Sequence, residues 1–208
     1  MSIILRACNV SFKDILNYPE IEIQEKKATF INGASGCGKS TLFRLFNATQ
    51  SPDSGSIIYD GKDIETFDTI SLRQQILLVG QSVYLFDGTI QDNFNQFYSF
   101  RQVEPLSEDK MSYFLSLSCC DFSLKTDCSV MSGGERQRIF LAICISFMPK
   151  VLMLDEPTSA LDSVSSNQLL FNMKNFCEEH QITLLVISHD KTLTEKYADE
   201  IITIERSM

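Results

Sequence analysis

The chain has 208 residues, of which 44% are hydrophobic and 22% charged, a composition that allows one globular domain to bury its own core. Its longest apolar stretches, such as 139–148, are shorter than the roughly 20 residues that cross a bilayer, and the N-terminus lacks the pattern of a signal peptide. A net charge of −9 argues against nucleic acid as the main partner. We therefore expect a soluble, cytosolic protein.

Hydrophobic patterning predicts strands and helices in the following order along the chain. Apolar, β-branched segments predict strands near 3–12, 20–24, 28–32, 56–60, 76–80, 151–155, 183–188 and 200–205. Amphipathic segments predict helices near 39–47, 107–117, 133–147, 163–179 and 191–197. The stretches VLMLD and TLLVIS are continuously apolar, which is typical of strands buried on both faces of a parallel sheet. An α/β fold follows.

The region 82–148 interrupts the strand series, because its pattern is mainly helical and includes the polar stretch SFRQVEPLSEDK. The sequence contains no internal repeat and no low-complexity linker. We therefore expect a single domain over residues 1–208. Its core would comprise about 1–81 and 149–208, with an inserted helical subdomain over about 82–148.

The stretch FINGASGCGKSTLF, residues 30–43, reads as a strand, the motif Gly-x-x-x-x-Gly-Lys-Ser and a helix. The glycines let backbone N–H groups surround an anion, and the helix adds the partial positive charge of its N-terminus. Lys39 in such a loop reaches the β- and γ-phosphates, and Ser40 ligates Mg²⁺. Cys37 is interpreted as a small filler, since no histidine accompanies it. The candidate phosphate-binding residues are Gly33, Ala34, Ser35, Gly36, Cys37, Gly38, Lys39, Ser40 and Thr41.

The strand in VLMLDEP, residues 151–157, supplies the second half of this site. Its carboxyl end presents Asp155 to the Mg²⁺ shell. Glu156 follows directly, and a carboxylate beside the γ-phosphate can orient and deprotonate the attacking water. Taken alone, Glu156 could equally be a helix-capping or solvated acid. Its place beside a P-loop favours the catalytic interpretation, so the sequence predicts binding and hydrolysis of a nucleoside triphosphate.

The stretch MSGGERQR, residues 131–138, places two glycines at the start of a predicted helix, where glycine ordinarily weakens the helix. Ser132 can cap that helix, and the bare backbone of Gly133 and Gly134 lets a phosphate approach the helix N-terminus. A chain with one P-loop does not need a second cradle for its own nucleotide, whereas a second copy of the chain would. The pattern therefore favours an anion site that acts across a dimer.

SGGERQR resembles the signature motif of ATP-binding cassette (ABC) proteins, which usually reads Leu-Ser-Gly-Gly-Gln. Other motifs in family order extend the resemblance over nearly the whole chain. Gln81 in LVGQSVYLFDGTI resembles the Q-loop glutamine, SALD at 159–162 the D-loop, and His189 in ISHD the switch histidine. The resemblance implies an α/β P-loop fold with a small antiparallel β part, ATP and Mg²⁺ as cofactors, and ATPase activity.

In the ABC family two subunits pair head to tail and sandwich two ATP molecules, each between one P-loop and the other subunit's signature. The resemblance implies a homodimer in the ATP-bound state, in which Ser132, Gly133 and Gly134 act in trans and Asp162 faces the dimer interface. It implies that His189 contacts the γ-phosphate. The implied metal ligands are Ser40, Gln81 and Asp155, and the implied catalytic residues are Glu156, His189, Lys39 and Gln81.

The sequence departs from the family pattern at two places. The aromatic residue that stacks on adenine normally lies before the P-loop; here Phe12 is the better candidate and Tyr18 the runner-up. Glu135 stands where the family usually has glutamine, which keeps the shape and adds a negative charge. The neighbouring Arg136 and Arg138 could offset that charge.

Two functions fit these motifs: a subunit that energises a separate membrane permease, and a non-transport ATPase that acts on DNA or another macromolecule. DNA-acting relatives carry a long coiled coil between the Q-loop and the signature, and the interval from Gln81 to Ser132 is too short for one, so transport is favoured. The stretch QSVYLFDGTIQDNF resembles exporter cassettes, and the chain looks most like the ATP-binding subunits of bacterial iron-export (Fet-type) ABC transporters. This resemblance implies iron or another metal as cargo, with the lipid or peptide cargo of other small exporters as the alternative.

The resemblance also implies where the chain would act. We expect a cytoplasmic protein held at the inner face of the membrane by its permease. In this family a short permease helix docks near the Q-loop. Here that indicates an apolar, aromatic set beside Gln81, namely Val83, Tyr84, Leu85, Phe86, Phe94 and Phe97. The alternative for each of these residues is the core of the helical subdomain, because aromatic residues at this density usually pack internally.

Overall fold

The computed structural model describes residues 2–205. Its strands are β1 (Ile3–Phe12), β2 (Leu16–Tyr18), β3 (Ile21–Gln24), β4 (Ala28–Asn32), β5 (Ser54–Tyr59), β6 (Lys62–Asp63), β7 (Ile76–Val79), β8 (Val151–Asp155), β9 (Thr183–Ile187) and β10 (Glu200–Thr203). Its helices are α1 (Lys39–Phe46), α2 (Thr69–Gln75), α3 (Ile90–Phe100), α4 (Glu108–Leu117), α5 (Gly133–Ser146), α6 (Ser163–Glu179) and α7 (Lys191–Tyr197), with 3-10 turns at Ile64–Thr66 and Cys128–Val130. All the predicted strands and helices are present.

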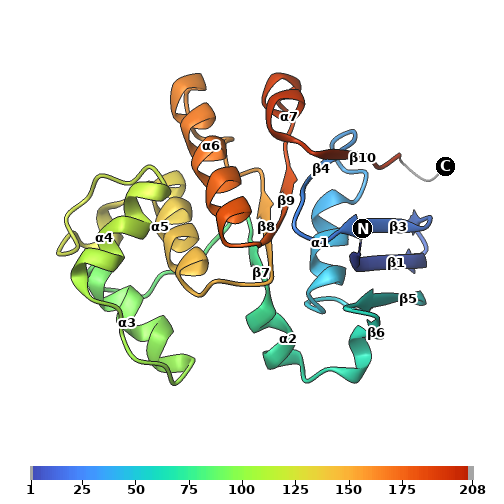
Figure 1. Cartoon of the computed structure of the whole chain (residues 1–208), viewed down its shortest axis with the longest axis horizontal. Coiled ribbons are helices and arrows are strands. Elements are labelled where there is room, and N and C mark those ends of the chain that lie inside the picture. Colours follow the sequence, from blue (N-terminus) through green and yellow to red (C-terminus); the bar gives the residue numbers. More distant parts are fainter. Residues whose placement is uncertain (1, 206–208) are drawn as a thin grey trace.

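A five-stranded parallel sheet in the order β10-β4-β9-β8-β7 forms the centre of the molecule (Figure 1). β8 and β9 are buried along their whole length, which confirms the prediction from their continuously apolar sequences. Side chains alternate along β8, so that Val151 and Met153 enter the core on one face and Leu152 and Leu154 the core on the other. Both faces of this sheet are therefore covered.

A second, antiparallel sheet is built around β1, which pairs with β5 on one edge and with β2 and β3 on the other. Helix α1 lies between the two sheets (Figure 1). Its side chains Leu42, Phe43, Leu45 and Phe46 are fully buried, and each contributes about 1.5–3 kcal/mol by leaving water. Because α1 follows the P-loop directly, this packing anchors the loop between the sheets.

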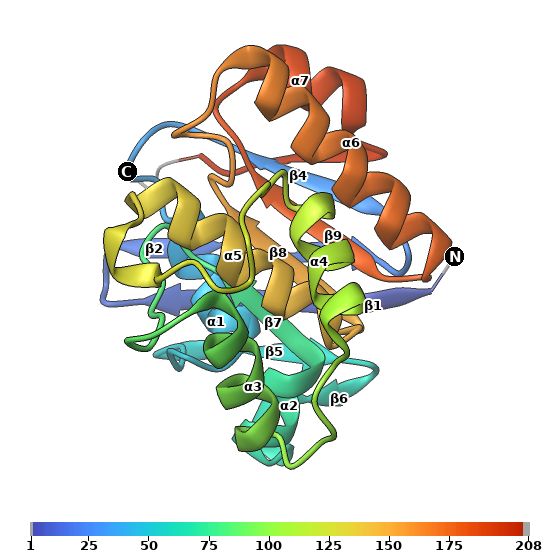
Figure 2. The ribbon, with the colours of Figure 1, turned by 90° about the vertical axis from the view of Figure 1, so that its left-hand side faces the viewer.

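Helices α3, α4 and α5 lie on the opposite side of the parallel sheet and face the viewer in Figure 2. α5 packs on both α4 and β7, so it connects this helical part to the sheet. The sequence patterns did not predict α2 or α3 as separate helices. α3 is rich in aromatic residues that favour strands, but Thr89 and Asp92 form a capping box at its start, which is a local signal for a helix. Within residues 2–205, no helix has the length and apolarity needed to span a bilayer.

Candidate nucleotide site

The loop between β4 and α1 has the backbone that phosphate binding requires. Gly33 and Gly38 have φ angles of 150° and 101°, which side-chain-bearing residues rarely adopt. A Cβ at Gly33 would lie 2.4 Å from the carbonyl oxygen of Ile204, and one at Gly38 would lie 2.5 Å from the hydroxyl of Tyr18. Among residues 2–205, no side chain caps α1, which begins at Lys39 directly after Gly38. The N–H groups at the start of α1 are thus available to an anion.

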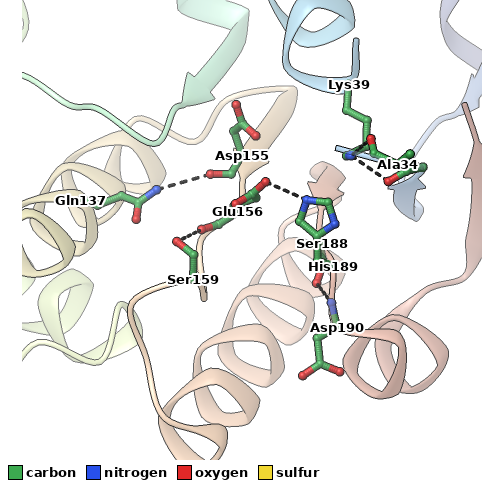
Figure 3. Close-up of polar contacts among 10 residues, drawn as sticks. Ala34, Lys39, Gln137, Asp155, Glu156, Ser159, Ser188, His189 and Asp190 are labelled. Atoms are coloured by element: carbon green, nitrogen blue, oxygen red, sulfur yellow. Dashed lines mark hydrogen bonds and ion pairs between the residues drawn. The ribbon is translucent and has the colours of Figure 1, made fainter. Parts of the chain in front are cut away.

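Lys39 lies inside this loop instead of extending into solvent. It is 6% exposed, and its ammonium donates hydrogen bonds to the carbonyl oxygens of Gly33 and Ala34 at 2.9 Å each (Figure 3). These bonds compensate the burial of a charge that would otherwise be costly. The structure thus holds one positive charge at the centre of the predicted phosphate cradle.

Asp155 ends β8 with a buried carboxylate. The side chain is 4% exposed, and its Oδ1 has no hydrogen-bond partner among residues 2–205. Burial raises the pKa of Asp155, although the Ser40 hydroxyl, Arg44 and Lys39 act in the opposite direction. An unpaired carboxylate oxygen beside a hydroxyl is an arrangement that suits a hard cation such as Mg²⁺. The residues present therefore fit the metal that the P-loop implies.

Glu156 follows Asp155 in a left-handed conformation, with φ at 52°, which is uncommon for a residue with a side chain. Its backbone N–H donates to the carbonyl oxygen of Ile187 at 3.1 Å, so the bend is held against the end of β9. Its Oε1 lies 3.0 Å from Nε2 of His189 (Figure 3). The two candidate catalytic side chains, which are 33 positions apart in sequence, are thus brought together at adjacent strand ends.

One pocket brings most of these groups together. Residues of the P-loop line it together with Leu16, Gln81, Glu156 and His189. Gln81 also lines the neighbouring pocket, which contains Asp155. Gln81 therefore lies between the phosphate cradle and the candidate metal ligand. Sequence reasoning did not identify Leu16, whose only signal is an apolar residue shortly before the P-loop.

The two candidate aromatic residues do not line this pocket. Tyr18 is 2% exposed and its hydroxyl donates to the carbonyl oxygen of Gly38 at 2.8 Å, so it contacts the P-loop from within the core. Phe12 is 9% exposed and packs in the core beneath the antiparallel sheet. The geometry supports neither ring as a platform for adenine. Leu16 is the apolar side chain that the structure places at the pocket.

The signature stretch lies at the N-terminus of α5. Ser132 caps this helix, and both Ser132 and Gly133 are exposed. Gly134 faces the D-loop so closely that an added Cβ would lie 2.9 Å from that of Ala160. None of residues 131–135 is among the described residues that line the P-loop pocket. Within one chain, the signature does not complete the nucleotide site.

Asp162 caps the helix that follows the D-loop. Its carboxylate accepts from the N–H groups of Val164 and Ser165 at 2.9 and 3.0 Å, and these bonds lower its pKa. The side chain is exposed. Asp162 therefore has a structural role in its own subunit as well as a position open to a partner.

Gln137 is a residue of this region that sequence reasoning missed. Gln137 is 6% exposed, and its amide donates to the carbonyl oxygen of Gly80 at 2.9 Å. The same amide donates to the carbonyl oxygen of Asp155 at 3.5 Å (Figure 3). These carbonyls lie at the carboxyl ends of β7 and β8. Gln137 thus ties the signature helix to the strand ends that carry Gln81 and Asp155. A polar residue within an otherwise buried helix face is the signal that could have identified it.

Comparisons with known proteins agree with this geometry. The family model described as "ABC transporter" matches residues 16–159. The chain is 34% identical over 191 residues to the Escherichia coli K12 protein named "Probable iron export ATP-binding protein FetA", covering 92% of this chain and 84% of that protein. The structure of cbiO1 from Clostridium perfringens, part of the ABC transporter complex cbiONQ, matches with a TM-score of 0.82 and 26% identity over 100% of this chain and 88% of that one. A bacterial Atm1-family ABC exporter with ATP bound matches with a TM-score of 0.85 and 26% identity, over 98% of this chain and 38% of that one.

Fold and site together define an ATP-binding core of the P-loop class. The chain belongs to the ABC transporter family. Its activity is ATP hydrolysis that energises transport. The alternative of an ATPase acting on DNA is not favoured, because the interval between Gln81 and Ser132 holds two short α-helices, α3 and α4, of 11 and 10 residues, in place of a long coiled coil.

Proposed function

We propose that this chain is the ATPase subunit of an exporter whose membrane permease is a separate protein. The observation that carries the proposal is the convergence of Lys39, Glu156 and His189 on one pocket, while Ser132 lies exposed on another element. A site divided in this way suits a subunit that closes on a second copy when ATP binds. Such closure is a movement that a permease can use.

Three residues would hold Mg²⁺ in this proposal: Ser40, Gln81 and Asp155. The unpaired Oδ1 of Asp155 supports the assignment, as does the position of Gln81 between the two pockets. The ion would neutralise phosphate charge and withdraw electrons from the γ-phosphate. Gln81 is exposed, so its side chain can reach or leave the ion without disturbing the core.

Glu156 is proposed as the general base that takes a proton from the attacking water. Its side chain reaches the P-loop pocket from the end of β8 and is partly open to solvent. His189, which contacts Glu156, would orient this carboxylate and contact the γ-phosphate. Lys39 would neutralise negative charge on the phosphates. Adenine would lie near Leu16, the apolar residue of the pocket.

We propose a head-to-tail homodimer in the ATP-bound state. The exposed Ser132 and Gly133 of one subunit would meet the γ-phosphate bound by the other subunit's P-loop. Asp162 would lie at the same interface, since its side chain is exposed beside the D-loop. Two phosphate sites would then close together, and hydrolysis would separate the subunits.

The proposed permease surface is an aromatic cluster beside Gln81, formed by Tyr84, Phe86, Phe97 and Phe100. Tyr84 and Phe100 are 68% and 61% exposed, and Phe86 connects them through ring contacts of 5.0 and 5.6 Å. Exposed aromatic side chains in one patch indicate a protein partner. Two residues expected at this surface are instead core residues, because Leu85 and Phe94 are 3% and 0% exposed. The proposed location is thus the cytoplasmic face of the membrane, with the permease as anchor.

Iron or another metal is the proposed cargo, on the basis of the similarity to the Escherichia coli protein named for iron export. The test is transport by proteoliposomes that contain this chain and a candidate permease. ATP-dependent movement of Fe²⁺ that a Lys39→Ala variant abolishes would support the proposal. Stimulation of ATPase activity by a lipid or peptide, with no movement of Fe²⁺, would reject iron while retaining the exporter.

A further inference from the structure

The carboxylate of Glu135 engages both hydrogen-bond donors of Ser132. Oε2 of Glu135 accepts from the Ser132 hydroxyl at 2.7 Å and from its backbone N–H at 2.8 Å. In return, Ser132 Oγ accepts from the N–H of Glu135 at 3.3 Å. This reciprocal arrangement is a capping box. The donors that the head-to-tail site needs for a phosphate are therefore already bonded to a negative charge of their own chain.

The charge of Glu135 is not cancelled by an ion pair with any residue between 2 and 205. Arg136, which the sequence offered as a compensating charge, donates to the carbonyl oxygens of Cys128 and Leu85 at 2.6 and 3.1 Å. It therefore holds two loops together. The hydroxyl and N–H of Ser132 lower the pKa of Glu135, with a smaller contribution from Arg138, so this carboxylate is ionised at neutral pH.

The cap itself does not require this charge. A glutamine at position 135 would accept the same two bonds from Ser132 through its amide oxygen. The charge therefore matters mainly for what approaches the N-terminus of α5 from outside. In the proposed dimer, that is the γ-phosphate of the ATP bound by the other subunit, which is also negative.

We propose that Glu135 sets the ATP concentration at which two subunits close, because its negative charge, held at the donors of Ser132, repels the γ-phosphate that must reach them. Glu135 is a positioning residue that acts through Ser132 and repels a second negative charge. The inference rests on the head-to-tail site of the proposed function. It predicts that dimerisation requires more ATP than it would with glutamine at this position, and that ATP without Mg²⁺ is the poorer ligand because it carries more charge.

The test compares Glu156→Gln with the double variant Glu156→Gln, Glu135→Gln, since slow hydrolysis lets the dimer accumulate. Light scattering measures the fraction of dimer as Mg²⁺-ATP is titrated. The double variant should need about three- to thirty-fold less ATP for half-maximal dimerisation at low salt. This range corresponds to removing the repulsion between two like charges near a protein surface. The difference should shrink at high salt, where the repulsion is screened. A role restricted to helix capping would not respond to salt in this way.

Two further measurements separate the alternatives. Glu179→Gln removes the same charge from the exposed end of α6 and should not shift the ATP requirement. ATP affinity at protein concentrations too low for dimers should be equal with and without the Glu135→Gln substitution. Thermal stability should fall only slightly, because the amide keeps the cap and loses only the favourable interaction of the carboxylate charge with the helix N-terminus. An unchanged or higher ATP requirement in the double variant would overturn this inference alone. Absence of any dimer with Glu156→Gln, despite normal ATP binding, would overturn the head-to-tail site and this inference with it.

Discussion

The imidazole of His189 and the carboxylate of Glu156 meet at 3.0 Å across the carboxyl ends of β9 and β8. The contact depends on the left-handed bend at Glu156, whose N–H is bonded to the carbonyl oxygen of Ile187. Because the two strands are adjacent and parallel, their ends reach the same edge of the sheet as the P-loop. The proposed base and the residue that orients it are thus placed together by the sheet.

Replacement of Glu156 by glutamine should preserve ATP binding and abolish most hydrolysis. The amide can still bond to His189 but cannot accept a proton from water, so turnover should fall by about 10²- to 10⁴-fold. Phosphate release measures turnover, and light scattering should show an ATP-stabilised dimer. Normal turnover in the variant would mean that another residue activates the water.

Replacement of Lys39 by alanine should abolish productive ATP binding. The ammonium lies within the loop, and each charge-assisted hydrogen bond to phosphate contributes about 1.5–3 kcal/mol, so affinity should fall on the order of 100-fold. Calorimetry with Mg²⁺-ATP measures the change. Lys110→Ala, at an exposed position of α4, is the matched control and should bind normally. Wild-type affinity in the Lys39 variant would contradict the assignment of the phosphate site.

Replacement of Ser132 by arginine should block dimerisation and hydrolysis while leaving ATP binding by the single subunit nearly intact, because Ser132 lies outside the P-loop pocket. A mixture with Lys39→Ala subunits gives the sharper measurement. One composite site in the mixed dimer joins an intact P-loop to an intact signature, so part of the ATPase activity should return. If mixed dimers form and no activity returns, the subunits do not act head to tail.

Replacement of Tyr84 by glutamate should uncouple the chain from its permease. Tyr84 is 68% exposed, so the charge should leave the fold and isolated ATP binding intact while weakening the binding of a partner that packs on the aromatic cluster. Co-purification with the permease and stimulation of ATPase activity by it are the measurements. Tyr113→Glu, at an exposed ring on α4, is the control. Loss of the fold in the Tyr84 variant, with normal coupling of the remaining protein, would place docking elsewhere.

Replacement of Asp199 by asparagine should lower stability at neutral pH but not in acid. Burial by itself would raise the pKa of Asp199, but hydrogen bonds from the Ala28 N–H and the Lys174 ammonium outweigh it and lower the pKa. A pKa lowered in the folded state gives stability that is present above the unfolded pKa of about 4 and is lost as the pH falls through the folded value. Urea unfolding at pH 7 should show a loss of about 1 kcal/mol. The difference between variant and wild type should narrow below about pH 4; a constant difference would show that the Asp199 charge is not involved.

The sequence by itself determined the motifs and their order, because each is a local structure. The glycines of the P-loop, the acidic end of β8 and the serine cap of α5 depend on a few consecutive residues, and the continuously apolar patterns of β8 and β9 predicted a buried parallel sheet. These choices between local conformations are set by backbone sterics and hydrogen bonding. They do not require knowledge of distant neighbours.

Only the tertiary structure decided which side chains face the site and which fill the core. Tyr18 and Leu16 both lie on β2, which pairs with β1 in a regular register. Tyr18 bonds to the carbonyl oxygen of Gly38, whereas Leu16, two residues earlier, lines the pocket. Gln137 meets the carbonyl of Gly80 across 57 positions of the chain. Packing of distant elements creates such contacts, and an aromatic or polar residue has the same local pattern whether it is buried or exposed.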